Sequence, residues 1–336
     1  GSGNFSDKTS FKTNEWYPSL PRNIVVSNIL DTSVSVSYLP PVTPNGNIER
    51  YNYKVNYDNV HDTYELDGVT VNQDFTINGL LPYTSYNVSV NSCNNLYCSE
   101  FSDNLGFITD EGIPSKPINL IYSNLDSTGI DINWDIPNQP NGIITHYDYT
   151  MDYTILCNNS QQTISSSSSN NFISFNTLQP YTSYNLVIKA CTIKGCSQNS
   201  NSLSFQTANQ IPDKMLITSL ETVNTSIKLS FDNNDLECHG KITNYEVKLE
   251  DSTNNIQELT YSSNGITNFI TINNLAPFME YGVRIRGYTD VGASIYSNQL
   301  NTQLPPGTPP KPDIPFVFNN SVTNNSLTLT INQVLN

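Results

Sequence analysis

The sequence has few of the residues on which catalysis depends. It contains three histidines, His61, His146 and His239, which lie far apart along the chain. No G-x-S-x-G stretch and no Cys-His arrangement is present, so no nucleophile is paired with a base. The P-loop, G-x-G-x-x-G, HExxH and EF-hand patterns are also missing. We therefore expect no enzyme activity, no catalytic residue, no cofactor and no bound metal.

Positive charge and long apolar runs are also scarce. The chain has 15 Lys and Arg against 30 Asp and Glu, which argues against nucleic acid and anionic membrane as partners. No run of eighteen apolar residues occurs, and no basic start is followed by an apolar core and a cleavage site. We expect neither a membrane span nor an export signal within this segment. No RGD triplet supports integrin-type binding.

What the sequence does contain is a repeat. The hexapeptide PYTSYN occurs at 82–87 and again at 180–185. Its surroundings match as well, and a third copy follows: NGLLPYTSYNVSVNSCNNLYCS, NTLQPYTSYNLVIKACTIKGCS and NNLAPFMEYGVRIRGYTDVGAS. A period of roughly 97 residues gives about three units, each of the usual size of one domain.

Each unit shows the alternation of strands that are half buried against a core. The segments VSVSY, IDINW and IKLSF end on an aromatic residue, and each is followed by a turn and a further alternating run: PNGNIERYNYKV, PNGIITHYDYTM and CHGKITNYEVKL. Asn-Gly is typical of such turns, because Gly accepts a positive φ. The tyrosines at alternate positions of these runs resemble a ligand platform, but at period two they are better interpreted as core.

These motifs, in order and three times over, resemble the fibronectin type III domain across essentially the whole chain. The resemblance rests on the aromatic ending the second strand, the NG-x-I-x-x-Y segment and Leu-x-Pro-x-x-x-Tyr before the sixth strand. It implies an all-β fold of tandem seven-stranded, immunoglobulin-like β-sandwiches in an extended array. It also implies tyrosine corners, in which a buried Tyr hydroxyl bonds back to the backbone, at Tyr86, Tyr184 and Tyr281. The family's Trp on the second strand survives only as Trp134.

The repeat also predicts where the domains lie. FSDKTSFKTNEWYPSLP near the start of the chain matches FSDNLGFITDEGIPSKP between the first two units, and LPPGTPPKP near the end resembles a linker. We expect a window onto a longer array, divided as follows: 1–17, the last strand of a preceding domain plus linker; 18–110, 111–208 and 209–303, complete domains; 304–336, a Pro-rich linker and the first two strands of a further domain.

The six cysteines suggest an oxidising compartment. Cys93 with Cys98, and Cys191 with Cys196, flank a four-residue loop between the last two strands of their units, where a hairpin sets them opposite each other at a Cα distance near the 5 to 6 Å of a disulfide. The third unit lacks both, which favours a bond within each loop. The alternative, half of a metal site, needs further ligands nearby.

Cys157 and Cys238 come from different units but are both expected at the junction between those units. A disulfide joining them would stiffen the junction and stabilise the fold by up to roughly 4.5 kcal/mol, against about 2 kcal/mol for each hairpin bridge. Bonds to another chain and free thiols remain alternatives.

Several surface features carry weaker predictions. Six sequons mark possible glycosylation sites, and the run Ser165–Ser169 is expected to be a flexible loop that could carry O-linked sugar. Arg284 and Arg286 alternate on one strand, where they form either a solvated face or a site for an acidic partner. The sequons are Asn4, Asn87, Asn158, Asn224, Asn319 and Asn324.

The sequence thus predicts a non-catalytic extracellular protein, secreted or on the cell surface, that acts as a structural or adhesive element of a fibre or matrix. Its expected partners are proteins, by self-association or on another surface, and possibly glycans. The alternative is the ectodomain of a kinase- or phosphatase-type receptor that binds a protein ligand. An accessory module of a secreted carbohydrate-active enzyme is a third possibility.

Overall fold

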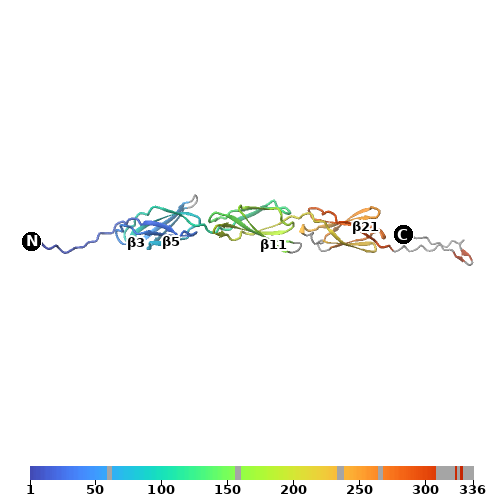
Figure 1. Cartoon of the computed structure of the whole chain (residues 1–336), viewed down its shortest axis with the longest axis horizontal. Helices are drawn as coiled ribbons and strands as arrows, with labels where there is room; N and C mark the ends of the chain where they lie inside the picture. Colours follow the sequence, from blue (N-terminus) through green and yellow to red (C-terminus); the bar gives the residue numbers. More distant parts are fainter. Residues whose placement is uncertain are drawn as a thin grey trace.

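The computed structural model of the chain consists of β-sandwiches arranged end to end (Figure 1). It describes residues 1–58, 63–155, 160–232, 238–263, 268–307, 322–323 and 326–327. Across these residues no helix is long and apolar enough to cross a membrane. We call 18–110, 111–208 and 209–303 the first, second and third units.

The first unit pairs a three-stranded sheet with a four-stranded one. The smaller sheet has the order β1 (Arg22–Ser27), β2 (Ser33–Leu39) and β5 (Asp74–Asn78). The larger has the order β4 (Thr63–Thr70), β3 (Ile48–Asp58), β6 (Ser85–Asn94) and β7 (Leu105–Ile108). All pairs are antiparallel.

The second and third units repeat this topology. In the second unit the smaller sheet has the order β12 (Phe172–Phe175), β9 (Ile130–Asp135) and β8 (Ile118–Ser123). The larger sheet begins with β11 (Ser160–Ser168), β10 (His146–Ile155) and β13 (Ser183–Thr192). Two further strands, β14 (Gly195–Cys196) and β15 (Leu203–Gln206), both pair with β13. In the third unit the smaller sheet has the order β16 (Leu216–Val223), β17 (Ser226–Asp232) and β20 (Phe269–Ile272). The larger sheet has the order β19 (Ile256–Ser262), β18 (Asn244–Asp251), β21 (Glu280–Tyr288) and β22 (Leu300–Gln303).

The two ends of the chain lie outside this repeat. Residues 1–21 form no strand, and the remainder of the domain to which 1–17 were assigned is not in the chain, so that assignment stays a prediction. Near the other end β23 (Val322–Thr323) pairs with β24 (Ser326–Leu327). Most of 304–336 lies outside the described residues.

Alternation along the strands builds a separate core in each unit. β2 and β17 share one pattern of buried and partly buried positions, because successive side chains point to opposite faces of a sheet. The aromatic ending the second strand is buried each time, as Tyr38, Trp134 or Phe231. Burying one large apolar side chain contributes about 1.5–3 kcal/mol.

The replacement of tryptophan in two units leaves the core packing intact, because in every unit the aromatic residue of the second strand packs against a tyrosine of the third strand. The centroid of Tyr38 lies 4.8 Å from that of Tyr51, Trp134 lies 5.3 Å from Tyr147, and Phe231 lies 4.9 Å from Tyr245. The tyrosines that resembled a ligand platform also pack on the core: Tyr51, Tyr53 and Tyr57 in the first unit, and Tyr147, Tyr149 and Tyr153 in the second.

Candidate structural and contact sites

The PYTSYN repeat builds the crossing into the sixth strand. Tyr184 lies near the start of β13, and its hydroxyl accepts a hydrogen bond of 2.8 Å from the backbone N–H of Gln179. Burial raises the pKa of the Tyr184 phenol to about 12. The same bond runs from Leu81 to Tyr86 at 2.8 Å and from Ala276 to Tyr281 at 3.0 Å. The hydroxyl therefore satisfies a backbone donor at the point where the chain passes between sheets.

Disulfides close the hairpin after the sixth strand in two of the three units. Cys93 is bonded to Cys98 and Cys191 to Cys196, with Cα atoms 4.0 Å apart, closer than the 5 to 6 Å expected. Ladder bonds flank the pair on both sides, from Asn94 to Tyr97 and from Ser99 to Ser92. The cysteines thus occupy a non-hydrogen-bonded pair, where antiparallel strands approach most closely.

The third unit forms the same bridge without sulfur, between Tyr288 and Ala293. Cys238 is also disulfide-bonded. Its predicted partner, Cys157, lies outside the described residues, so the link between units stays a prediction.

Paired serines hold the chain beyond each hairpin. In the second unit the Ser197 hydroxyl accepts from the N–H of Ala190 at 3.0 Å, and the Ser200 hydroxyl accepts from the N–H of Ile188 at 3.0 Å. The serines at 99 and 102 and at 294 and 297 have the same S-x-x-S spacing, and their hydroxyls also accept hydrogen bonds from backbone N–H groups of the sixth strand. These bonds satisfy donors of the sixth strand where the last strand is not yet paired. We missed this role, although the spacing is visible in all three repeats.

The linkers, by which we mean residues 16–17, 110–113 and 208–210, are held by backbone and side-chain bonds to the body of the unit that follows. Gly112 donates its N–H to the Asn141 carbonyl at 2.7 Å, and the Asn141 side chain donates to the Ile113 carbonyl at 2.7 Å. The Thr192 hydroxyl donates to the Gly112 carbonyl at 2.9 Å. We call these contacts the linker clamp. They give the Asn of the PNG turn a second role, beyond the turn geometry that its sequence predicted.

The clamp recurs at the other linkers. The Asn94 side chain donates to the Trp16 carbonyl at 2.7 Å, and the Thr289 hydroxyl donates to the Gln210 carbonyl at 3.0 Å. Glycine occupies the same turn position in all three units, and Gly142 shows why. Its φ is +157°, and a Cβ there would lie 2.8 Å from the Glu111 side chain.

The two linkers between units are bonded to the preceding unit too, and Ala208 donates its N–H to the Asp126 carbonyl at 3.0 Å. Asp110 donates its N–H to the Leu30 carbonyl at 3.2 Å, and Tyr83 donates its N–H to the Asp110 carbonyl at 3.0 Å. The Asp110 carboxylate also pairs with Lys194 of the next unit at 3.0 Å. Because Thr192 and Lys194 both lie inside the loop closed by Cys191 and Cys196, the disulfide fixes the hairpin that holds the junction.

In the third unit a charged and aromatic cluster stands beside the hairpin that lacks the disulfide. Glu246 on β18 pairs with Arg286 on β21 at 2.7 Å and accepts hydrogen bonds from the hydroxyls of Tyr288, at 2.7 Å, and Tyr296. The Arg286 guanidinium lies over the Tyr296 ring, 4.5 Å from its centroid. We call these four side chains the Glu246 cluster.

Glu246 is charged because the cluster stabilises its anion. Burial alone raises the pKa of the Glu246 carboxyl, but the hydrogen bonds from Tyr288, Tyr296 and Arg286 outweigh burial and leave that pKa below its ordinary value. Burial and the bond to Glu246 raise the pKa of Tyr296. Arg286 is therefore occupied within the unit, while Arg284 pairs with Glu250 at 3.7 Å and donates to Gln299.

The structure also places the weaker sequence features. Asn4, Asn87 and Asn224 are exposed, whereas Asn158, Asn319 and Asn324 lie outside the described residues. The expectation of a flexible loop at Ser165–Ser169 was wrong, because Ser165–Ser168 belong to β11, which β10 pairs in an unbroken register. Polar side chains are tolerated there since β11 is an edge strand.

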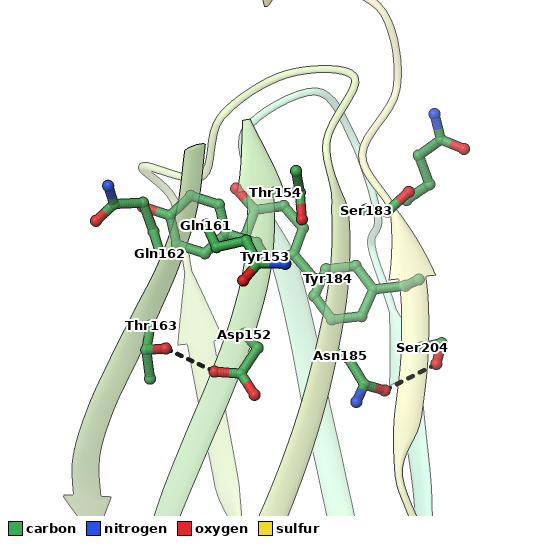
Figure 2. Close-up of a pocket in the computed structure, with 12 residues that line it drawn as sticks. Asp152, Tyr153, Thr154, Gln161, Gln162, Thr163, Ser183, Tyr184, Asn185 and Ser204 are labelled. Carbon is green, nitrogen blue, oxygen red and sulfur yellow. Dashed lines mark hydrogen bonds between the residues drawn. The ribbon is translucent and has the colours of Figure 1, made fainter. Parts of the chain in front are cut away.

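An open depression of about 720 Å³ crosses four strands of the second unit (Figure 2). Its polar side chains bond to one another: Thr163 donates to Asp152 at 2.6 Å, and Ser204 donates to Asn185 at 2.9 Å. The lining offers hydroxyl, amide and carboxylate groups, which can form hydrogen bonds to a partner. It consists of Asp152, Tyr153, Thr154, Gln161, Gln162, Thr163, Ser183, Tyr184, Asn185, Ser204, Phe205 and Gln206.

Comparison with known proteins finds three domains of one family in the chain. The model of the fibronectin type III domain matches residues 19–107, 115–206 and 214–303. Human phosphatidylinositol phosphatase PTPRQ is 29% identical over 313 residues, which cover 90% of this chain and 13% of that protein. Tyrosine-protein phosphatase Lar of Drosophila melanogaster is 24% identical over 279 residues, 82% of this chain and 14% of that protein.

A further relative, the cell adhesion molecule Dscam2 of Drosophila melanogaster, is 26% identical over 226 residues, 64% of this chain and 11% of that protein. The chain therefore spans only a small part of each relative.

Proposed function

The chain belongs to the fibronectin type III family, and from that membership we propose that it is a non-catalytic, extracellular spacer with a structural or adhesive role in a cell-surface fibre or matrix. The linker clamp is the observation that supports this role best. The linkers 110–113 and 208–210 are each bonded to the unit before them and the unit after them, so neighbouring units resist bending relative to one another. A stiff row of domains transmits force and holds binding surfaces at a fixed spacing.

Small-angle X-ray scattering of the whole chain tests the stiffness. The longest strands of the three units have 11, 10 and 9 residues, so the row of three units should form a rod of roughly 100 Å, at about 3.4 Å per residue. The variant Thr192→Val with Asp110→Asn removes one clamp contact and the ion pair between Asp110 and Lys194, and it should broaden the distance distribution. Thr150→Val, at a partly buried position of β10 away from the linkers, is the control. A broad distribution in the unmodified chain would contradict the rigid spacer.

Partner contact is proposed through the sheets and their edges. The polar depression of the second unit presents groups that bond to peptide or to sugar hydroxyls, and β11 is an edge strand to which a further strand could be added. Exposed Asn87 and Asn224 are the sequons that we propose for glycosylation. Mass spectrometry of protein secreted from cells would identify the occupied asparagines, and unmodified asparagine at both would contradict this part.

The second candidate is the ectodomain of a phosphatase-type receptor that binds a protein ligand. It is favoured by the similarity to PTPRQ and Lar, which extends over most of this chain. Sedimentation velocity over a range of concentrations separates the two functions. A fibre element should self-associate as its concentration rises, whereas a receptor ectodomain should stay monomeric until its ligand is added.

A further inference from the structure

The hairpin disulfide of the second unit has two neighbours that the first unit lacks. His146 lies directly opposite Cys191 in the ladder between β10 and β13, and Asp148 is two residues further along the same face of β10. The His146 Nε2 atom is 3.5 Å from Asp148 Oδ1. The Sγ atoms of Cys191 and Cys196 are each 3.7 Å from Asp148 Oδ2.

Apart from the two bonded sulfur atoms, which separate on reduction, these atoms are spaced like the ligands of a tetrahedral metal site. One donor atom from each of His146, Asp148, Cys191 and Cys196 lies within 4.8 Å of the other three. Around zinc, with Zn–S near 2.3 Å and Zn–O near 2.0 Å, sulfur and oxygen ligands stand about 3.5 Å apart. The Thr145 hydroxyl is 2.8 Å from His146 Nδ1, which leaves Nε2 directed to Asp148 and fixes the ring as a ligand.

We propose that reduction of the Cys191–Cys196 disulfide converts this hairpin into a binding site for Zn²⁺ or a similar thiophilic divalent cation. The ligands are the two thiolates, His146 Nε2 and one carboxylate oxygen of Asp148. The hairpin then has two closed states, one held by a disulfide and one by a metal. This site is independent of the proposed spacer role.

The conversion requires a two-electron reductant of the thiol or phosphine class. A phosphine attacks one sulfur, the S–S bond breaks, and the phosphorus is oxidised to the phosphine oxide. Water supplies that oxygen and the two protons that end on the thiols. The cation then displaces both thiol protons and binds the neutral imidazole and the Asp148 carboxylate, so two protons are released for each ion bound.

The first unit provides a matched control within the same chain. Its hairpin has the same pair of cysteines, but Arg50 and Asn52 occupy the places of His146 and Asp148. Arg50 Nη2 lies 4.0 Å from Cys98 Sγ, and Asn52 Nδ2 lies 3.1 Å from Cys93 Sγ. A guanidinium and an amide N–H oppose a cation, and among the residues that the structure describes no histidine or carboxylate joins these two cysteines in a possible metal site.

Cobalt titration of the whole chain tests the proposal, since Co²⁺ replaces Zn²⁺ and absorbs visible light when four-coordinate. After phosphine reduction without oxygen, we expect one tight Co²⁺ per chain, with a thiolate-to-cobalt band. The oxidised chain should give none. The variant His146→Arg with Asp148→Asn copies the first unit and should lose more than about 100-fold in affinity, because loss of ligands exceeds loss of their outer partners.

The reverse exchange, Arg50→His with Asn52→Asp, should add a second tight Co²⁺ on reduction. Hydrogen exchange measured by mass spectrometry follows the folding of both units in every sample. Equal Co²⁺ affinity in the reduced unmodified chain and the His146→Arg, Asp148→Asn variant would overturn the proposal. So would unfolding of the second unit on reduction that Zn²⁺ fails to reverse, because no assembled site would then exist.

Discussion

The hairpin after the sixth strand is closed by a disulfide in the second unit, and by Tyr288 and Ala293 in the third. Both hairpins keep the same ladder bonds, and the same pair of serines follows each. The disulfide is therefore not what shapes the hairpin. It restricts the unfolded chain and holds the loop that contacts the linker.

The third unit stabilises the same region by another route. Glu246 occupies the position of Asp148 and binds Arg286 and two tyrosine hydroxyls. Its stability should therefore respond to charge and pH, whereas that of the second unit should respond to reductant. Four predictions test this difference, from the largest expected effect to the smallest.

Removing the charge of Glu246 should be the most damaging change. Glu246→Gln leaves Arg286 partly buried without its anion, which should destabilise the third unit by about 3 kcal/mol. Hydrogen exchange in peptides of the third unit measures the loss within the whole chain. Glu250→Gln, whose pair with Arg284 is more exposed, is the control and should cost less than about 1 kcal/mol. Equal losses would show that the cluster has no special weight.

Acid should weaken the same unit without a mutation. The pKa of Glu246 is lower in the folded state than its ordinary value of 4.5, so its contribution to stability is complete above that value and is lost as the pH falls below it. At the acid end the loss approaches that of Glu246→Gln. The first unit, with Asn52 at this position, should lose less. Hydrogen exchange of each unit, measured over a series of pH values, gives the stability of the first and the third unit separately. Equal loss of stability in the two units as the pH falls would contradict this prediction.

Removing the hairpin disulfide should cost about 2 kcal/mol in the second unit, from the entropy of a short closed loop. Cys191→Ser with Cys196→Ser tests this, and Cys93→Ser with Cys98→Ser should give a similar loss in the first unit. Phosphine treatment of the unmodified chain should reproduce both losses and leave the hairpin of the third unit unchanged. Loss of protection there on reduction would contradict the comparison, unless it is confined to residues near Cys238.

Loss of the tyrosine-corner hydroxyl should destabilise all three units to a similar extent. Tyr86→Phe, Tyr184→Phe and Tyr281→Phe each leave a backbone N–H without its acceptor, at a cost of about 1–2 kcal/mol. Because the pKa of Tyr184 is raised from 10.0 to about 12, its contribution is complete below pH 10 and is lost as the pH rises through 12. Denaturant midpoints measured for the three variants should shift alike; a much larger shift in one unit would break the equivalence.

Much of the fold followed from local patterns. Alternation gave the strands, the aromatic at 38, 134 and 231 gave a core position, and the resemblance gave Tyr86, Tyr184 and Tyr281 as buried tyrosines whose hydroxyls the structure places against backbone. The single departure that looked serious, loss of tryptophan at two second strands, has little effect because Tyr51, Tyr147 and Tyr245 supply the same ring opposite.

The contact sites were harder to predict. His146 is far from the cysteines in the sequence, which counted against the metal-site alternative, but the register of β10 on β13 sets it opposite Cys191. Arg286 was a candidate for an external acidic partner, but Glu246, forty residues earlier in the chain, already binds it. Asn141 was predicted only as a turn residue, and its side-chain bond to the Ile113 carbonyl was not predicted.

The sequence by itself determined the three-unit repeat, the β-sandwich and the positions of the turns, because these depend on periodicity and on residues close together in the chain. Only the tertiary structure decided which side chains meet across strands and how each linker is held. Such contacts depend on the register between strands and on the approach of successive units, and no local pattern encodes either.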